Sequence, residues 1–279
     1  MSSPSASDLS IGEVVKATGV GEATLRAWER RFGFPRPHRQ PSGHRRYSRD
    51  EVERIVRVVE ERERGIALAT AIERARAAAA GVPSLFARLR ERRPELQPMT
   101  IRKRHLVHLA HAIEEESAAR AERVLLIGSF QRERFFRQSE ARWRALARGA
   151  EHAFVFADFK RLRRPRGRPA EIPVDRSHPV SREWGLICEA PEHGSCMVGW
   201  EPPGRAPSPD PEREFEVLLS VEPTVVRDAA EAAAAIAAPV APEVAEAARR
   251  CLEGLAAPRA ESQLRLAGAI TARLLSALR

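Results

Sequence analysis

The sequence predicts two domains, a small helical one followed by a larger mixed α/β one, and three observations lead to this fold class. The chain has 279 residues, whereas one domain usually holds ~100–200 residues. Residues 9–80 show helical spacing of apolar side chains with short turns, and residues 101–257 alternate apolar runs with amphipathic stretches. Between them, residues 81–100 carry three prolines and a run of arginines, which predicts a linker. Residues 1–8 are rich in serine and predict a disordered tail, and residues 258–279 predict a separate C-terminal helix.

Composition narrows the class of protein. Basic residues outnumber acidic ones by 47 to 38, and the 43% of hydrophobic residues are enough to form a core. No run of about 18 apolar residues is present, and Met1 to Ser10 lack the pattern of a secretory signal, so we expect a cytoplasmic protein without a membrane partner. The three cysteines form no C-x-x-C pair, which excludes a disulfide framework and a cysteine-rich zinc site. Cys188 and Cys196 lie on neighbouring predicted strands, where we expect reduced, buried thiols, with redox sensing as the alternative.

The N-terminal region begins with two short predicted helices. Ser10-Ile-Gly-Glu13 is a capping box, in which serine and glutamate each satisfy a free backbone N–H of the first turn. Gly19-Val20-Gly21 ends this helix. A second helix is predicted from Glu22 to about Phe32, with Leu25 on its buried face, and Gly33 ends it. Two helices joined by a short glycine-containing turn form the helix-turn-helix pattern.

A small β-hairpin, or wing, is predicted next, over residues 38–47, because Pro41-Ser42-Gly43 is a turn signal between two short flanks. Ser48-Arg-Asp-Glu51 is a second capping box and begins a third helix. A fourth helix is expected from Ile66 to Ala80. The residues expected to face inward are Val52, Ile55, Val56 and Val59 on the third helix, and Leu68, Ala69 and Ile72 on the fourth.

Positive charge is concentrated on this region. Between Arg26 and Arg49 the chain carries eight arginines and one acidic residue, Glu29. A solvated helix face usually mixes both signs, so an island of one sign on a helix-turn-helix and wing predicts a surface that binds nucleic-acid phosphates. Tyr47 either donates its hydroxyl to a phosphate or packs at the base of the wing, and Trp28 is expected to pack in the small core. The expected DNA-binding residues are Thr24, Arg26, Arg30, Arg31, Arg39, Gly43, His44, Arg45, Arg46 and Tyr47.

The segments LRAWERRFG and GHRRY, within residues 9–75, resemble the DNA-binding domain of MerR-type regulators. In that family the second helix and the wing bind near-palindromic promoter DNA as a dimer. The resemblance therefore implies double-stranded DNA, a second copy of the chain and RNA polymerase as partners. The contacts that it implies are those of Thr24, Arg26, Arg30, Arg45 and Tyr47.

Two features depart from the family pattern. Gly21 stands where the family often has a serine N-cap, and glycine caps a helix only slightly less well. Gly81 and Pro83 cut short the long helix through which mercury-type members dimerise. We therefore expect dimerisation to use the C-terminal part of the chain.

The second domain is predicted to contain a parallel βαβ unit. Val124–Ile127 and His152–Phe159 are apolar strands, and the residues between them, 131–147, form an amphipathic helix. A helix is expected to begin at Thr100, and residues 160–182 are expected to form a loop. The other expected elements are strands over 184–189, 196–200 and 215–221, the first two facing each other across a hairpin turn, and helices over 223–257 and after Pro258.

The segments RVLLIGSFQRERFF, RWRALARGAEHAFVFADF, REWGLICEA and MVGWEPPG resemble the DICT sensory domain. The resemblance implies that this domain senses a signal, an unknown small molecule or protein. Ligands favour the carboxyl ends of parallel strands, where we expect Phe130, Gln131, Arg134, Phe159 and Trp184 to bind one. The alternative is that these residues are core aromatics and a surface arginine.

No further motif predicts a metal, a cofactor or catalysis. His105, His108 and His111 share one helix but have no carboxylate or cysteine pattern to complete a metal site. The Asp175-x-x-His178 pair lacks the D-x-H-x-x-G cobalamin signature. No P-loop, G-x-S-x-G or H-E-x-x-H motif is present, so we expect no cofactor and no enzymatic activity.

These observations lead to one hypothesis, a homodimeric MerR-type transcriptional regulator whose α/β domain senses a signal. The alternatives are a DNA-bending architectural or recombination-accessory protein without ligand sensing, and an enzyme with a DNA-binding appendage. The C-terminal helix either pairs two subunits or packs on its own domain. Its apolar stripe is expected to consist of Leu264, Ala267, Ile270, Thr271, Leu274 and Leu278.

Overall fold

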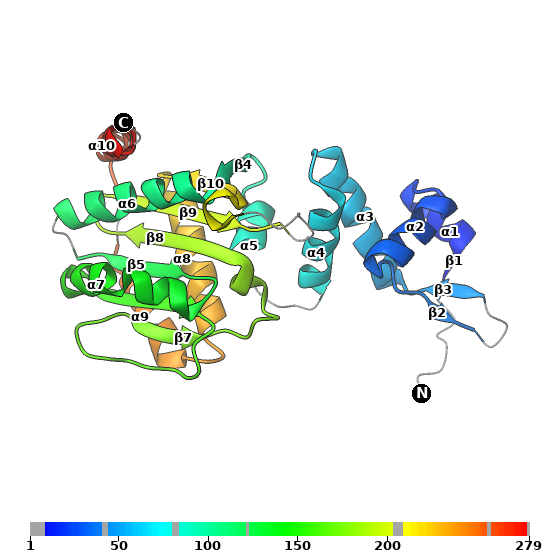
Figure 1. Ribbon diagram of the computed structural model, residues 1–279, viewed down its shortest axis with the longest axis horizontal. Helices are drawn as coiled ribbons and strands as arrows, with labels where there is room; N and C mark the ends of the chain where they lie inside the picture. Colours follow the sequence, from blue (N-terminus) through cyan, green and yellow to red (C-terminus); the bar gives the residue numbers. More distant parts are fainter. Residues whose placement is uncertain are drawn as a thin grey trace. The chain divides into compact units, whose positions relative to one another are not determined.

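The computed structural model describes residues 9–40, 44–79, 84–120, 123–202, 209–255 and 258–277. The chain divides into two compact units, Met1–Val82 and Pro83–Arg279. Figure 1 labels most of their helices and strands. Within the described ranges, no helix is long and apolar enough to cross a membrane.

The first unit contains four helices and a three-stranded sheet among its described residues. The sheet has the order β1-β3-β2, with all pairs antiparallel. The predicted wing is confirmed, and it gains a strand that the sequence analysis missed, since Leu9 and Ser10 pair with Tyr47 and Arg46. The elements are β1 (Leu9–Ser10), α1 (Ile11–Thr18), α2 (Glu22–Phe32), β2 (His38–Arg39), β3 (Arg45–Tyr47), α3 (Arg49–Glu63) and α4 (Leu68–Ala79).

Local capping explains where the helices of this unit begin and end. The Ser10–Glu13 capping box is present, with the Ser10 N–H donating to Glu13 Oε2 at 2.7 Å. Gly33 ends α2 in the left-handed conformation, with φ 61°, which glycine adopts without steric cost. The second capping box is only half formed. Ser48 Oγ accepts from the Glu51 N–H at 3.2 Å, but Glu51 Oε1 accepts instead from the Arg36 N–H at 2.6 Å.

The buried faces of α3 and α4 are shifted from those predicted, although Ile55 and Ile72 are buried as expected. Ile55 and Val58 are fully buried on α3, whereas Val56 and Val59 are only partly buried. The reason is that α3 packs against both α1 and α4, which turns the middle of its buried face toward the row of Glu51, Ile55 and Val58. On α4 the buried residues are Thr70, Ala71, Ile72 and Ala75, and Leu68 and Ala69 are only partly buried.

A seven-stranded sheet forms the centre of the second unit, in the order β4-β10-β9-β8-β5-β6-β7. The pairs β5–β6 and β6–β7 are parallel and all other neighbours are antiparallel. The predicted βαβ unit and the β8–β9 hairpin are confirmed. The strands are β4 (Met99–Arg102), β5 (Leu125–Ser129), β6 (His152–Ala157), β7 (Ala170–Pro173), β8 (Glu183–Glu189), β9 (Gly194–Trp200) and β10 (Glu214–Ser220).

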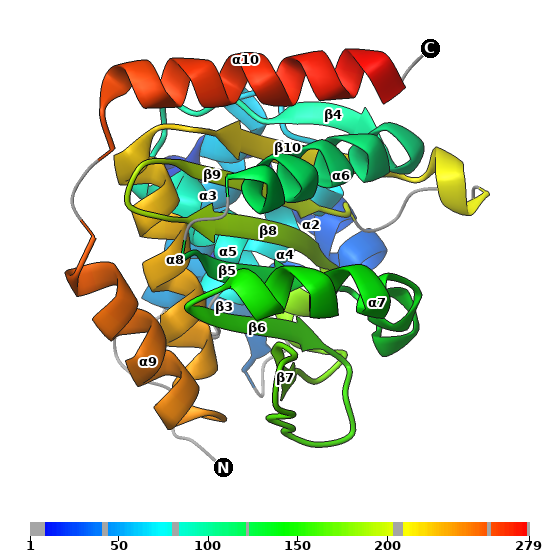
Figure 2. The same ribbon diagram turned by 90° about the vertical axis from the view of Figure 1, so that its left-hand side faces the viewer.

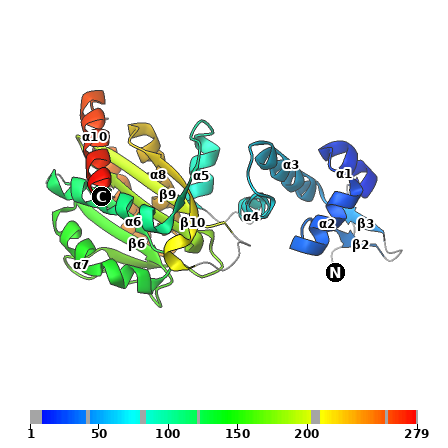
Figure 3. The same cartoon turned by 45° about the horizontal axis from the view of Figure 1, so that its top comes forward.

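Helices cover both faces of this sheet and form two separate cores. On one face α6, α7 and α10 pack against residues such as Leu126 and Val155; on the other, α5, α8 and α9 pack against residues such as Ile127 and Phe154. Figure 2 shows α6 and α7 in front of the sheet and α8 behind it. The last helix, α10, lies beside α6 (Figure 2 and Figure 3). The helices are α5 (Leu85–Arg92), α6 (Lys103–Ala119), α7 (Glu133–Gly149), α8 (Pro223–Ala237), α9 (Pro242–Glu253) and α10 (Ala260–Ala277).

The linker predicted over residues 81–100 is wrong for most of its length. Residues 84–100 belong to the second unit, because α5 inserts Leu85 and Leu89 into its core and β4 pairs with β10. Two arginines of this run, Arg92 and Arg93, have acidic partners distant in sequence; Arg93 Nε donates to Asp228 Oδ2 of α8 at 2.6 Å. The loop predicted over residues 160–182 likewise contains β7 and a short 3-10 helix, Pro179–Arg182.

Candidate nucleic-acid interface and strand-end pocket

Helix α2 is buried along one side only. Leu25 is its one fully buried residue, and Thr24, Arg26, Arg30 and Arg31 are all exposed. Because successive residues turn by about 100° around a helix axis, Arg30 lies near the middle of the exposed face, with Thr24 and Arg26 on its two flanks. Ala23 and Ala27, also exposed, leave space on that face for close approach of a partner.

Arg26 of α2 and the wing meet at a small depression of about 200 Å³. Its lining comes from the end of β1, the start of α1, α2, and β3 with the residue before it, and consists of Ser10, Ile11, Arg26, His44, Arg45 and Arg46. Four of the residues predicted from sequence to bind DNA are therefore brought together here, although up to 20 positions separate them along the chain. Ser10 and Ile11 are members of this site that the sequence analysis missed.

An ion pair fixes the wing against α2. The Arg45 guanidinium contacts the Glu29 carboxylate through Nε at 2.8 Å and Nη2 at 3.4 Å, and both side chains are about a quarter exposed. Glu29 raises the pKa of Arg45, so the pair stays charged. Arg26 is similarly paired with Glu22, one turn earlier on α2. The single acidic residue of the basic island therefore has a structural role, and Arg45 positions the wing as well as adding charge to the surface.

The remaining predicted DNA-binding residues are one buried tyrosine, two arginines and one glycine. The Tyr47 side chain is buried, at 1% exposure, and burial raises the pKa of its hydroxyl. The expectation of a phosphate contact by Tyr47 is therefore wrong, and the alternative, packing at the base of the wing, is what the structure has. Arg31 lies over the Phe32 ring at 5.2 Å. Arg39 lies in β2, and Gly43 lies outside the described residues.

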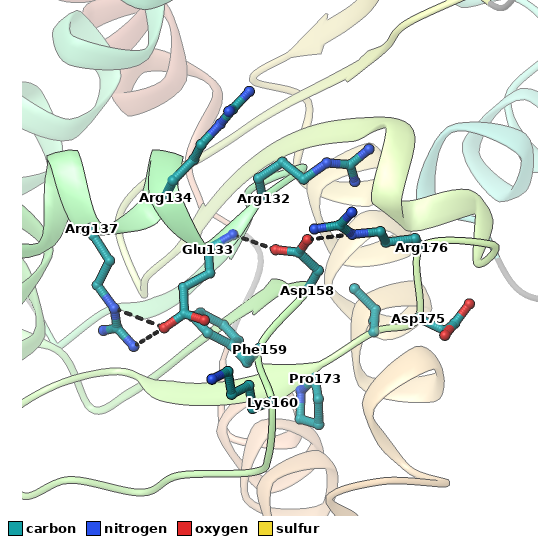
Figure 4. Close-up of a pocket in the computed structure, with 11 residues that line it drawn as sticks. Arg132, Glu133, Arg134, Arg137, Asp158, Phe159, Lys160, Pro173, Asp175 and Arg176 are labelled. Carbon is teal, nitrogen blue, oxygen red and sulfur yellow. Dashed lines mark hydrogen bonds and ion pairs between the residues drawn. The ribbon is translucent and has the colours of Figure 1, made fainter.

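The second unit has an open pocket of about 1040 Å³ at the carboxyl ends of its three parallel strands. Asp158, Phe159 and Lys160 follow β6, Pro173 to Arg176 include the end of β7, and Arg132 to Arg137 form the start of α7, which follows β5. Figure 4 shows these side chains arranged around the pocket. We call it the strand-end pocket.

Ion pairs order part of the strand-end pocket. Asp158 accepts from the Glu133 N–H at 2.6 Å and from Arg176 Nε at 2.9 Å, so a carboxylate already lies at the start of α7. Arg137 is bidentate to the buried Glu171, with both N–O distances at 2.8 Å, and Glu133 binds it as well. Both acids raise the pKa of Arg137 and keep it charged. The dashed lines of Figure 4 mark the two Asp158 contacts and the Arg137–Glu133 pair.

Only two of the five ligand-binding residues predicted from sequence line this pocket. Arg134 and Phe159 do. Phe130 instead packs edge-on against Phe136 and Trp143 in the core, and Trp184 packs edge-on against Phe215. Neither residue lines the strand-end pocket, and their ring contacts fit the core alternative; a ligand contact by either one stays a prediction. The sequence signal that would have found the pocket is the set of residues directly after each parallel strand.

Gln131 belongs to a separate, partly buried polar network. Its Nε2 donates to Glu201 Oε2 at 2.8 Å, and Arg213 Nη2 donates to its Oε1 at 2.6 Å. With both ends of the amide engaged, Gln131 holds the start of α7 against the segment that follows β9. The network fits a structural role, and a ligand contact by Gln131 stays a prediction.

The buried cysteines point to opposite sides of the sheet. Cys188 belongs to the core covered by α6 and Cys196 to the core covered by α8, so the two thiols cannot pair. Burial raises the pKa of each to about 12, which leaves them protonated and unreactive. Among the described residues, no group of three histidines, cysteines or acids is arranged to hold a metal ion.

Two family models match the chain, and they divide it as the structure does. The model described as MerR HTH family regulatory protein matches residues 9–78. The model described as sensory domain in diguanylate cyclases and two-component system, DICT, matches residues 83–202. The second match begins at the boundary between the two units and includes α5, consistent with the correction of the linker.

Among curated proteins, relatives named as transcriptional regulators match part of the chain. The HTH-type transcriptional repressor CarA of Myxococcus xanthus is 44% identical over 88 residues, which are 30% of this chain and 30% of the relative. The HTH-type transcriptional regulator MlrA of Escherichia coli is 42% identical over 45 residues, 16% of this chain and 18% of the relative. The chain thus spans less than a third of the length of these relatives.

Proposed function

Because the chain joins a MerR-type helix-turn-helix domain to a DICT sensory domain, we propose that it is a DNA-binding transcriptional regulator that responds to a signal. The observation that carries the proposal is the convergence of Arg26, His44, Arg45 and Arg46 on one side of the first unit. A surface with this density of guanidinium groups, beside an exposed helix, suits duplex DNA. Because DNA is the proposed target, we assign the protein to the cytoplasm.

In the proposed mode of binding, α2 enters the major groove with its exposed face toward the base edges. Arg30, in the middle of that face, suits a bidentate contact with guanine, since guanidinium matches the guanine O6 and N7 acceptors. Thr24 and Arg26 flank it. The wing, held against α2 by the Arg45–Glu29 pair, brings His44 and Arg46 to the neighbouring phosphates.

A dimer fits this mode better than a monomer. One such module buries only ~600–1,000 Å² on DNA, which is small for tight, specific binding. Two copies on a near-palindromic operator place their half-sites about one helical turn, ~34 Å, or a multiple of it apart. Contact with RNA polymerase is a further part of the proposal, as the family resemblance implies.

The proposal is tested with a duplex selected from random-sequence DNA by repeated binding and amplification. Fluorescence anisotropy at several salt concentrations then compares the wild type with Arg30→Ala and Arg45→Ala. We expect both variants to bind more weakly, Arg30→Ala because it removes the guanine contact, with relaxed specificity at that base pair, and Arg45→Ala because it removes a cation of the wing. The control is Arg144→Ala, an exposed arginine of α7 in the second unit.

Equal affinity of the wild type and both interface variants, or failure to enrich any duplex, would contradict the proposal. Mapping the selected sequence onto the genome separates the alternatives. Sites in promoters support a regulator, whereas sites in recombination regions would indicate an architectural or accessory protein. Turnover of a metabolite by the intact chain would instead indicate an enzyme with a DNA-binding appendage.

A further inference from the structure

We infer that the strand-end pocket binds a small organic anion, a molecule with an apolar body and one carboxylate or phosphate group. Only one part of the inference, that this anion is the signal, rests on the proposed function. The existence of the site depends on the second unit alone.

The position of the pocket is the first argument. It lies where three parallel strands end, and β5, in the middle of the sheet, has a parallel neighbour on one side and an antiparallel neighbour on the other. Crevices outside the carboxyl ends of parallel strands, where the chain direction changes across the sheet, are the usual ligand sites of α/β folds. A volume of about 1040 Å³ is sufficient for a drug-sized molecule.

The chemistry of the lining is the second argument. Phe159 has 6% of its surface exposed and, with Pro173 and Val174, gives the pocket an apolar part. Five cationic side chains and three acidic ones complete the lining: Arg132, Arg134, Arg137, Lys160 and Arg176, and Glu133, Asp158 and Asp175. An apolar surface bordered by excess positive charge suits an amphipathic anion.

The ion pairs show which cations are available. Arg137 is held by Glu133 and Glu171, and Arg176 by Asp158. Arg132, Arg134 and Lys160 have no carboxylate partner among the described residues; Arg132 donates to the Gln131 carbonyl at 2.8 Å and Arg134 lies over the Phe135 ring at 4.8 Å. The only acidic residue of the lining that forms no ion pair there is Asp175, whose Oδ1 accepts from the Ser177 N–H at 2.8 Å.

The start of α7 adds to the positive potential of the pocket. Its backbone N–H groups point toward the strand ends, and Asp158 is bound there through the Glu133 N–H. Because Asp158 occupies that position, the ligand anion is expected beside it, between Arg134 and Lys160. These two residues come from different elements, α7 and the segment after β6, so the site requires the folded unit.

The experiment uses the full chain and the aromatic anion 1-anilinonaphthalene-8-sulfonate, whose fluorescence rises in an apolar environment. We expect one saturable site, from which phenyl phosphate displaces the probe and phenol does not. Arg134→Glu and Lys160→Glu are each expected to weaken probe binding by roughly tenfold, because each removes a cation and adds an anion. The control, Arg144→Glu, changes an exposed arginine of the same helix outside the pocket and is expected to leave binding unchanged.

Three results would overturn the site: no saturable binding of the probe, equal binding by the wild type and both pocket variants, or displacement by phenol as effective as that by phenyl phosphate. Circular dichroism of each variant checks that the unit remains folded.

Measuring DNA affinity with and without phenyl phosphate separates the two proposals. If the pocket binds the anion and DNA affinity does not change, the site stands and its role as the signal site fails; if no duplex binds at all, the proposed function fails and the pocket is unaffected.

Discussion

At the scale of single residues, Glu183 is the most constrained carboxyl group of the second unit. It is fully buried at the start of β8, and its oxygens accept from the Leu85 N–H at 3.0 Å, from the Phe86 N–H at 3.2 Å and from the Ser84 hydroxyl. Burial raises its pKa to about 7. The residue therefore caps the first helix of the second unit, at the point where the chain arrives from the first.

A pH dependence of stability follows from this raised pKa. The folded state holds the proton of Glu183 up to about pH 7, whereas an exposed glutamate releases it near pH 4.5. The stabilisation that Glu183 gives the folded state is therefore fully present below pH 4.5 and is lost as the pH rises through 7. The free energy of unfolding falls by roughly 3 kcal/mol over this range. Urea unfolding at pH 5 and pH 8, followed by tryptophan fluorescence, measures it.

The variant Glu183→Gln removes this titrating group while keeping an acceptor for the helix. We expect the free energy of unfolding of the variant to fall less than that of the wild type between pH 5 and pH 8. The control is Glu253→Gln, at an exposed position. Parallel pH profiles for the wild type and Glu183→Gln would refute the assignment.

A second residue-scale prediction concerns Gly128 in β5. A Cβ atom at this position would collide with the indole ring of Trp143, which cannot retreat easily because its Nε1 donates to Glu114 at 2.9 Å inside the core. Gly128→Ala is expected to destabilise the second unit by about 1–3 kcal/mol, the usual cost of overpacking. Chemical denaturation compares it with Gly149→Ala, where a Cβ meets open space. Equal stability of the two variants would contradict the packing argument.

At the scale of elements, α5 is a structural part of the second unit. Its residues Leu85, Phe86 and Leu89 are buried against the sheet and α8, and Glu183 caps its start. Its outer side carries Arg88 and Arg92; Arg92 pairs with Asp228 of α8, as does Arg93, the residue after the helix. The same eight residues thus combine an apolar inner face with a basic outer face.

Truncation of the inner face tests this role. Leu89→Ala is expected to lower the free energy of unfolding of the second unit by ~2–5 kcal/mol, through lost burial and the cavity left behind. The matched control on the same helix is Arg88→Ala, whose side chain is exposed and which should change stability little. A neutral Leu89→Ala variant would restore the view of this segment as a linker.

At the scale of the whole molecule, α10 gives a candidate surface for pairing two copies. Its buried residues are Ser262, Gln263, Leu266 and Ile270, which face the rest of the unit, so the predicted stripe that began at Leu264 is shifted. Leu264 is 75% exposed and Leu275 59% exposed. Eleven residues separate them, which is three helical turns, so they lie on one outer face.

We predict that a second copy of the chain covers this face. In an antiparallel two-fold pairing of α10, Leu264 of each copy meets Leu275 of the other, a self-complementary contact of the kind that a symmetric dimer requires. Leu264→Asp combined with Leu275→Asp is expected to shift sedimentation toward the monomer and to weaken operator binding. The control is Leu162→Asp, an exposed leucine of a loop in the same unit. A double variant that sediments as the wild type does would exclude this face as the interface.

The elements that sequence alone predicted are those specified by neighbouring residues. Each of these signals is local. The capping box of Ser10 and Glu13 begins the first helix, Gly33 ends the second, and the basic island contains the exposed arginines of α2 and the wing. The long MerR-type motif added the function. The apolar runs of β5, β6, β8 and β9 were found for the same reason, since each run is hydrophobic over its own length.

The tertiary structure decided what depends on partners distant in sequence. The pairing of Arg93 with Asp228 shows that this arginine belongs to the second unit and not to a linker. The pairing of Arg45 with Glu29 gives Arg45 a role in positioning the wing that the sequence did not reveal. Phe130 and Phe159 are both aromatic residues near strand ends, yet only Phe159 lines the strand-end pocket. Burial and charge pairing are set by which elements pack together, and no single stretch of the chain encodes that packing.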